Sequence, residues 1–253
     1  MKKPSLAIAV LVASAGSAFA ADLPSRTYTK APVMIPAVYD WTGFYIGLNG
    51  GGGFSHKCWT NTSTLGVPTV PTASEGCHDA SGGLVGGQVG YRWQWANWVF
   101  GVEGQGDWAD FKGSNSTLPS APVVGITNQT KIDAVGLITG QVGYAWNDVL
   151  WYVKGGAAVA HNTFNGFITA TGTPLDSADQ TRWGGAIGTG VEIGFAPNWT
   201  VGAEYDHLFM GTDTITLTTP AATVSRTDSI KQGVDIATVR VNYRFGGPVV
   251  AKY

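Results

Sequence analysis

The chain has 253 residues, of which 44% are hydrophobic, 13% are charged and 36 are glycine. Its formal net charge is −2 and it lacks the basic runs that nucleic acid requires, so nucleic-acid binding is not expected. No run of about eighteen apolar residues occurs, which excludes a helical membrane protein.

The N-terminus has the pattern of a secretory signal peptide. Two lysines precede a short apolar run, and the small residues of Ala18-Phe19-Ala20 follow. The apolar run is too short to span a bilayer, so we expect residues 1–20 to be cleaved after Ala20 and the rest to be exported. Residues 21–40, which contain three prolines, are expected to form a flexible periplasmic lead-in.

A repeated unit dominates the rest of the chain. The stretch Gly87–Trp93 (GQVGYRW) returns 53 residues later as Gly140–Trp146 (GQVGYAW), and Gly190–Phe195 is a looser copy. Each copy runs through a short turn into a second alternating segment, which is typical of a β-hairpin. With a first strand that starts at Trp41 and a last strand that ends at Phe245, the sequence predicts eight strands. Polar loops are expected at 55–80, 112–130, 161–181 and 210–230.

The distribution of charge between the two strand faces indicates a membrane. With Val85 and Val89 facing outward, the outer face includes Ile132 and Ile138 and carries no Asp, Glu, Lys or Arg on any strand; His207 lies near a rim. A basic residue on a lipid face costs about 2–4 kcal/mol at the bilayer midplane, whereas a soluble barrel would be polar outside. The inward face holds the charged residues Arg92, Glu103, Asp107, Asp133, Lys154, Arg182, Glu192, Glu204, Asp206, Arg240 and Arg244.

Aromatic residues support the same interpretation. Six of the ten tryptophans lie beside the three short turns, as in the aromatic girdle of a membrane interface. The predicted fold is all-β: an eight-stranded antiparallel transmembrane β-barrel over residues 41–245, with short periplasmic turns and long extracellular loops. Residues 246–253 form a C-terminal tail.

The inward charges are the first candidate site. An eight-stranded barrel is just wide enough for side chains to fill, and buried charges must be paired. We therefore expect the carboxylates to pair with the basic residues across the lumen. A packed polar core is the favoured interpretation, and a narrow pore gated by these ion pairs is the alternative. The network comprises Arg92, Glu103, Lys154, Glu192, Glu204, Arg240 and Arg244.

The cysteines and histidines form a second candidate group. Cys58 and Cys77 lie 19 residues apart in one exported loop, where an oxidising compartment favours a disulfide. His56 and His78 flank them, so a four-ligand metal site is the alternative. The same histidines, with His161, are candidate ligands for haemin or a metal.

No nucleophile and base occur together in a catalytic pattern. His207 lies near the outer rim but has no serine neighbour in the sequence. We expect neither an enzyme nor a cofactor.

Several motifs resemble a known family. Trp41–Gly47 (WTGFYIG), the two Gly-Gln-Val-Gly-Tyr copies, Asn198–Tyr205 (NWTVGAEY) and Val239–Phe245 (VRVNYRF) resemble the small outer-membrane β-barrel proteins of alphaproteobacteria, often called porin-family or RopB-type surface antigens. The resemblance covers essentially the whole mature chain, and the fold is also similar to the membrane domain of outer-membrane protein A. It implies roles in envelope integrity, surface antigenicity and, in some relatives, haemin binding.

The sequence thus predicts a monomeric barrel in the cell outer membrane that reinforces the envelope and presents its loops. A narrow porin-like channel for small solutes and a haemin-binding surface receptor are the alternatives. Expected partners are outer-membrane lipid and lipopolysaccharide, the barrel assembly machinery during insertion, and host or environmental ligands of the loops. Either Phe245 or Tyr253 is the assembly signal.

Overall fold

The computed structural model describes residues 39–119, 121 and 125–246. The expected signal peptide, the lead-in up to residue 38 and the tail beyond Gly246 lie outside these residues. Among those described, no helix is long and apolar enough to cross a bilayer. The strands are β1 (Gly43–Thr64), β2 (Val67–Trp95), β3 (Trp98–Ser116), β4 (Ile126–Trp146), β5 (Val149–Ile168), β6 (Pro174–Ala196), β7 (Trp199–Thr218) and β8 (Val224–Phe245).

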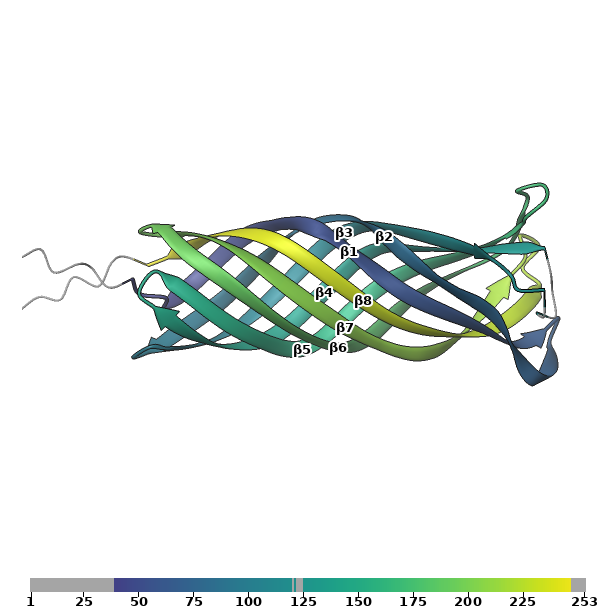
Figure 1. Cartoon of the computed structure of the whole chain (residues 1–253), viewed down its shortest axis with the longest axis horizontal. Helices are drawn as coiled ribbons and strands as arrows, with labels where there is room; N and C mark the ends of the chain where they lie inside the picture. Colours follow the sequence, from purple (N-terminus) through teal and green to yellow (C-terminus); the bar gives the residue numbers. More distant parts are fainter. Residues whose placement is uncertain (1–38, 120, 122–124, 247–253) are drawn as a thin grey trace, which may run out of the picture. The chain divides into compact units, whose positions relative to one another are not determined.

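The eight strands close into a barrel (Figure 1). Each strand pairs antiparallel with its neighbour in the chain, and β8 pairs with β1 from Phe44↔Phe245 onward. This confirms the predicted all-β, eight-stranded antiparallel architecture. Closure leaves no unpaired sheet edge at membrane depth, which is the condition for a sheet to lie in lipid.

Three two-residue turns mark one end of the barrel, which we call the turn end. They lie between β2 and β3, β4 and β5, and β6 and β7. Ala96 and Asn147, the first residues of two of these turns, have φ angles of 53° and 58°. This left-handed backbone is what tight hairpin turns require.

At the opposite end, the predicted long loops are wrong, because most of these residues continue the strands. β1 and β2 are joined by Leu65 and Gly66 alone, and the other connections are 117–125, 169–173 and 219–223. Beyond the membrane, water bathes the outer face, while charged residues and apolar residues such as Trp59 and Phe164 share the lumen. The outer face is therefore polar and the inner face mixed, so the apolar–polar alternation is lost and a strand has the hydropathy of a loop.

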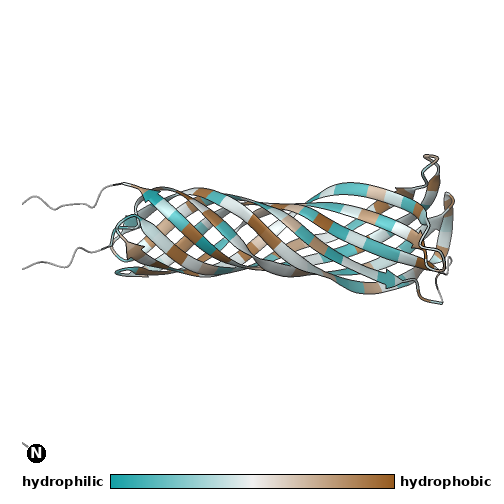
Figure 2. Ribbon diagram, turned by 90° about the horizontal axis from the view of Figure 1, so that it is seen from above, coloured by the Kyte–Doolittle hydropathy of each residue, from teal (hydrophilic) through white to brown (hydrophobic). Residues whose placement is uncertain are grey.

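The outer face carries the predicted apolar band. Trp93, Trp95, Trp98, Trp146, Trp151 and Trp199 at the turn end are all exposed, and Phe54, Trp108, Trp183 and Phe209 form a second exposed aromatic ring farther along. Phe44 and Phe54 on β1 are ten residues apart, which fits a strand crossing of about 9–11 residues. In Figure 2 hydrophilic colour becomes more frequent toward the end opposite the turns, beyond this band.

One assignment of faces is wrong at β4. The pairing register with β5 shifts between Ile132 and Ala134, because an extra residue is inserted there. Such a bulge reverses which residues face inward. Ile132 consequently lies in the lumen with no exposed surface, whereas Asp133 faces outward and pairs with Lys131.

Side chains fill the lumen in layers, which β8 displays in order from the turn end. Its lumen-facing residues are polar up to Thr238, apolar at Ile236 and Val234, and mostly polar again from Gln232 to Arg226. The apolar layer continues around the barrel, and we call it the apolar plug. It consists of Ala80, Leu84, Phe111, Ile132, Val135, Leu137, Ala158, Ala160, Ala186, Leu208, Met210, Val234 and Ile236.

Candidate functional site in the barrel lumen

The lower ionic cluster lies between the turn end and the apolar plug. Arg92 on β2 donates two parallel hydrogen bonds to Glu192 on β6, at 2.6 and 2.9 Å, across the lumen. Both side chains are buried. Asn242 and Thr200 donate to the second Glu192 oxygen at 3.1 and 3.0 Å. A fork of this geometry is the strongest form of an arginine–carboxylate pair.

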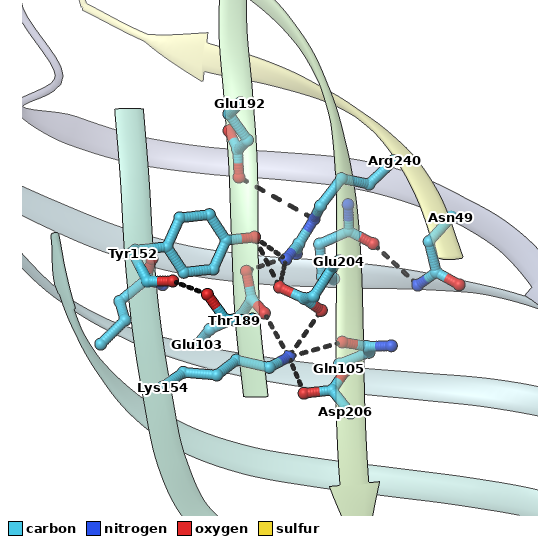
Figure 3. A network of polar contacts seen from close by, with 12 residues as sticks. Asn49, Glu103, Gln105, Tyr152, Lys154, Thr189, Glu192, Glu204, Asp206 and Arg240 are labelled. Carbon is cyan, nitrogen blue, oxygen red and sulfur yellow. Dashed lines mark hydrogen bonds and ion pairs between the residues drawn. The ribbon is translucent and has the colours of Figure 1, made fainter. Parts of the chain in front are cut away.

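Glu204 on β7 is the centre of the cluster, with Arg240 and Lys154 approaching it from two sides (Figure 3). Lys154 Nζ lies 2.6 Å from Glu204 Oε1 and 3.2 Å from Asp206 Oδ1. Arg240 also donates to Glu103 at 2.5 Å. The hydroxyls of Tyr152 and Tyr45 donate to Glu204 and Glu103, at 2.5 and 2.6 Å. The arrangement cross-links strands from opposite sides of the barrel.

The structure therefore brings six of the seven expected network residues into one connected cluster, but not Arg244. Arg244 lies at the turn end and donates to the carbonyl oxygens of Thr42 and Pro197, at 2.9 and 3.2 Å. It forms no ion pair with a described carboxylate. Its inward orientation was therefore predicted correctly, whereas the expected pairing with a carboxylate was wrong.

The turn end of the lumen is covered by the residues just before β1. Trp41, which the sequence placed in the first strand, precedes it and is 1% exposed. Its indole nitrogen donates to the Asn147 carbonyl at 3.0 Å, and its backbone nitrogen donates to Gln94 at 2.8 Å. The Tyr39 ring packs against it in a tilted arrangement, with ring centroids 4.8 Å apart. These contacts close the lumen at this end.

An upper ionic cluster, which the sequence did not predict, lies on the other side of the plug. Arg226 on β8 is shared by three buried carboxylates: Glu75 at 2.6 Å, Asp176 at 3.1 Å and Asp228 at 3.6 Å. Asn128 accepts from Arg226 at 2.7 Å and donates to Glu75 at 2.9 Å. All four charged residues fall in the expected loops. The sequence signal for them is a period of two in β8. It places Arg226, Asp228, Ile230 and Gln232 on one face of that strand.

The upper cluster predicts a pH-dependent stability of the strand extension, by which we mean the part of the eight strands beyond the second aromatic ring. Burial raises the pKa of Asp228 to about 7, and Glu75 adds to this, although Arg226 opposes it. Between about pH 4 and pH 7 the folded state thus holds a proton that the unfolded state has lost. The free energy required to open the extension locally around Asp228 should therefore fall as pH rises through this window, by up to about 4 kcal/mol. Above the window it should level off.

Hydrogen exchange of β8 amides around Asp228, corrected for intrinsic rates, measures this effect in refolded protein at pH 5 and pH 8. The matched control is Asp228→Asn, which retains an acceptor for Asn61 but does not titrate. Equal pH dependence in the wild type and the variant would contradict the assignment to Asp228.

The cysteine and histidine residues separate onto two faces. Cys58 and Cys77 are joined in a disulfide between directly opposite positions of β1 and β2. His56 is exposed on the outer face, whereas His78 is buried in the lumen, where it contacts Asn115 and Thr130. His161 faces outward on β5 against Thr181. The structure therefore does not bring the three expected haemin or metal ligands together.

Comparison with known proteins agrees with this architecture. A family model described as an outer membrane protein beta-barrel domain matches residues 5–245. This chain belongs to that family. Among the relatives of this outer-membrane barrel is the 31 kDa outer-membrane immunogenic protein of Brucella melitensis, which is 34% identical over 209 residues, covering 78% of this chain and 82% of the relative.

Solved structures share the fold of the outer-membrane barrel. The outer membrane protein OprG of Pseudomonas aeruginosa is 15% identical, with a TM-score of 0.51, and the match covers 80% of this chain and 97% of that one. At this identity the likeness shows the fold alone. In barrels of this layout the short turns face the periplasm, so the strand extension that contains Arg226 lies on the extracellular side.

Proposed function

We propose that this outer-membrane barrel is a closed structural element of the envelope, and that its strand extension serves as an interaction and antigenic surface. The observation that carries the proposal is the apolar plug, which lies across the lumen between two ionic clusters. An ion would have to leave water or charged side chains and cross a layer lined mainly by apolar side chains, at high cost. Hydrophobic constrictions of this kind close channels by excluding water.

The ion pairs support a structural role. They cross the lumen between strands that are not neighbours in the sheet, as with Arg92 on β2 and Glu192 on β6. A buried pair is costly to break, so these contacts resist deformation of the barrel by lateral pressure in the membrane.

The extension beyond the membrane supports the surface role. It is built from paired strands with short connections rather than long free loops, so its polar outer face is held in one shape. The Brucella relative is named as immunogenic. We extend this property to the present chain, together with export through a signal peptide cleaved after Ala20.

Single-channel recording separates the closed barrel from a pore. We expect no conductance steps from refolded wild-type protein in a planar bilayer. A Glu103→Ala, Glu192→Ala, Glu204→Ala variant should also be silent, because the plug remains. A Phe111→Ser, Leu208→Ser variant, which introduces hydroxyls into the plug, should show intermittent steps. All proteins are first checked for folding by heat-dependent gel mobility.

Regular steps from the wild type that change in the triple carboxylate variant would overturn the proposal. That result would make the lower ionic cluster a gate and the protein a narrow porin-like channel.

A further inference from the structure

Four outward-facing residues gather on the β1–β2 hairpin beyond the second aromatic ring. Cys58 lies directly opposite Cys77, and His56 lies opposite Asp79 in the next outward pair. The residues between them, including Lys57 and His78, point into the lumen and are buried. The alternation of the two strands thus separates His78 from the cysteines and leaves His56 beside them.

The geometry around His56 is that of a metal ligand. Its Nε2 lies 3.5 Å from Cys58 Sγ, and the ligand atoms of His56, Cys58 and Cys77 all lie within 4.8 Å of one another. Nitrogen and sulfur ligands of a tetrahedral zinc ion are about 3.6 Å apart, and two thiolates about 3.8 Å, given the usual bond lengths. His56 Nε2 and Cys58 Sγ are therefore already separated by one edge of such a tetrahedron.

Asp79 is the hydrogen-bond partner that the non-coordinating nitrogen of a metal-binding histidine usually has. Its Oδ1 lies 2.6 Å from His56 Nδ1. A carboxylate on the far nitrogen of a metal-binding imidazole fixes the ring orientation and leaves the other nitrogen free to coordinate. In this structure that free nitrogen is Nε2, which is directed at the cysteines.

We propose that reduction of the Cys58–Cys77 disulfide creates a zinc site on the outer surface of the extension, with His56 Nε2 and the two thiolates as ligands and water as the fourth. Two low-molecular-weight thiols reduce the disulfide through a mixed disulfide: they are oxidised to their own disulfide, and Cys58 and Cys77 each gain a proton and one electron. Zinc then replaces the two thiol protons. In the oxidised protein the sulfur atoms are bonded to each other and the site does not exist.

The site restores a link that reduction removes. The disulfide joins two strands outside the membrane, and a metal bound by residues from both strands would take its place. His56 and Asp79 have exposed side chains, so both the reductant and the ion can reach the site from solution.

Cobalt titration tests the proposal in refolded mature protein reduced by a phosphine, which is oxidised to its oxide. We expect one cobalt ion per chain, with absorption bands of a tetrahedral thiolate site that zinc abolishes and that the oxidised protein lacks. His56→Ala should weaken binding by at least about tenfold, and Asp79→Asn by about 10–100-fold. His161→Ala, another outward-facing histidine, is the matched control and should leave the affinity unchanged.

Two outcomes would overturn the proposal. One is equal cobalt binding by reduced wild type and a Cys58→Ser, Cys77→Ser variant. The other is equal affinity in His56→Ala and His161→Ala, which would mean that the thiols bind metal without this histidine.

Discussion

An arginine in place of Ile138 is expected to prevent insertion of the barrel into lipid. Ile138 faces outward on β4, is 69% exposed and lies between the two aromatic rings. A guanidinium there would meet hydrocarbon, at a cost of about 2–4 kcal/mol near the bilayer midplane. The yield of folded protein in lipid vesicles, read as the band that changes gel mobility on heating, should fall sharply.

The matched control lies on the same strand. Gln129 is on β4 beyond the bulge and outside the apolar band, so Gln129→Arg should insert normally. A normal yield for Ile138→Arg would show that the lipid-facing and lumen-facing sides have been assigned the wrong way round.

Replacing Glu192 by alanine should be the most destabilising single change in the lumen. Arg92 would remain buried without its carboxylate, and Asn242 and Thr200 would lose the acceptor they share. Removing one member of a buried ion pair costs about 3–5 kcal/mol. Urea unfolding from lipid vesicles measures this as a decrease in the free energy of unfolding.

A double replacement tests whether the unpaired charge of Arg92 causes the destabilisation expected for Glu192→Ala. In Arg92→Met, Glu192→Leu both charges are absent and apolar groups of similar size replace them, so we expect a smaller loss than in Glu192→Ala. If the double variant is the less stable of the two, the ion pair itself stabilises the barrel. The loss of stability in Glu192→Ala would then not come from leaving Arg92 buried without a partner.

Prediction from sequence succeeded for the barrel within the membrane. There one face of each strand meets lipid and the other meets packed side chains, so the period of two is visible in single residues such as Val89 and Arg92. The repeated hairpins located the turns, and the tryptophans beside them located one interface. The disulfide was predicted as well, because Cys58 and Cys77 are the only cysteines of an exported chain.

Prediction failed where that environment changes. Beyond the second aromatic ring the outer face is polar and the lumen face mixes charged and apolar residues, so the extension was taken for loops and the Arg226 cluster was missed. At Ile132 one inserted residue reversed the inward and outward faces, and a bulge leaves no mark in hydropathy. The apolar plug was also overlooked. Charged residues on the inward face do not show at which height in the lumen the inward-facing residues of all eight strands are apolar.

Within the membrane-spanning part of each strand, the sequence by itself determined which residues face lipid and which face the lumen, because the bilayer imposes that division residue by residue. Only the tertiary structure decided which lumen residues meet. Arg92 and Glu192 are 100 residues apart in the chain and lie on strands that do not pair. Their contact depends on barrel closure, strand tilt and register, which together set the height of each side chain in the lumen.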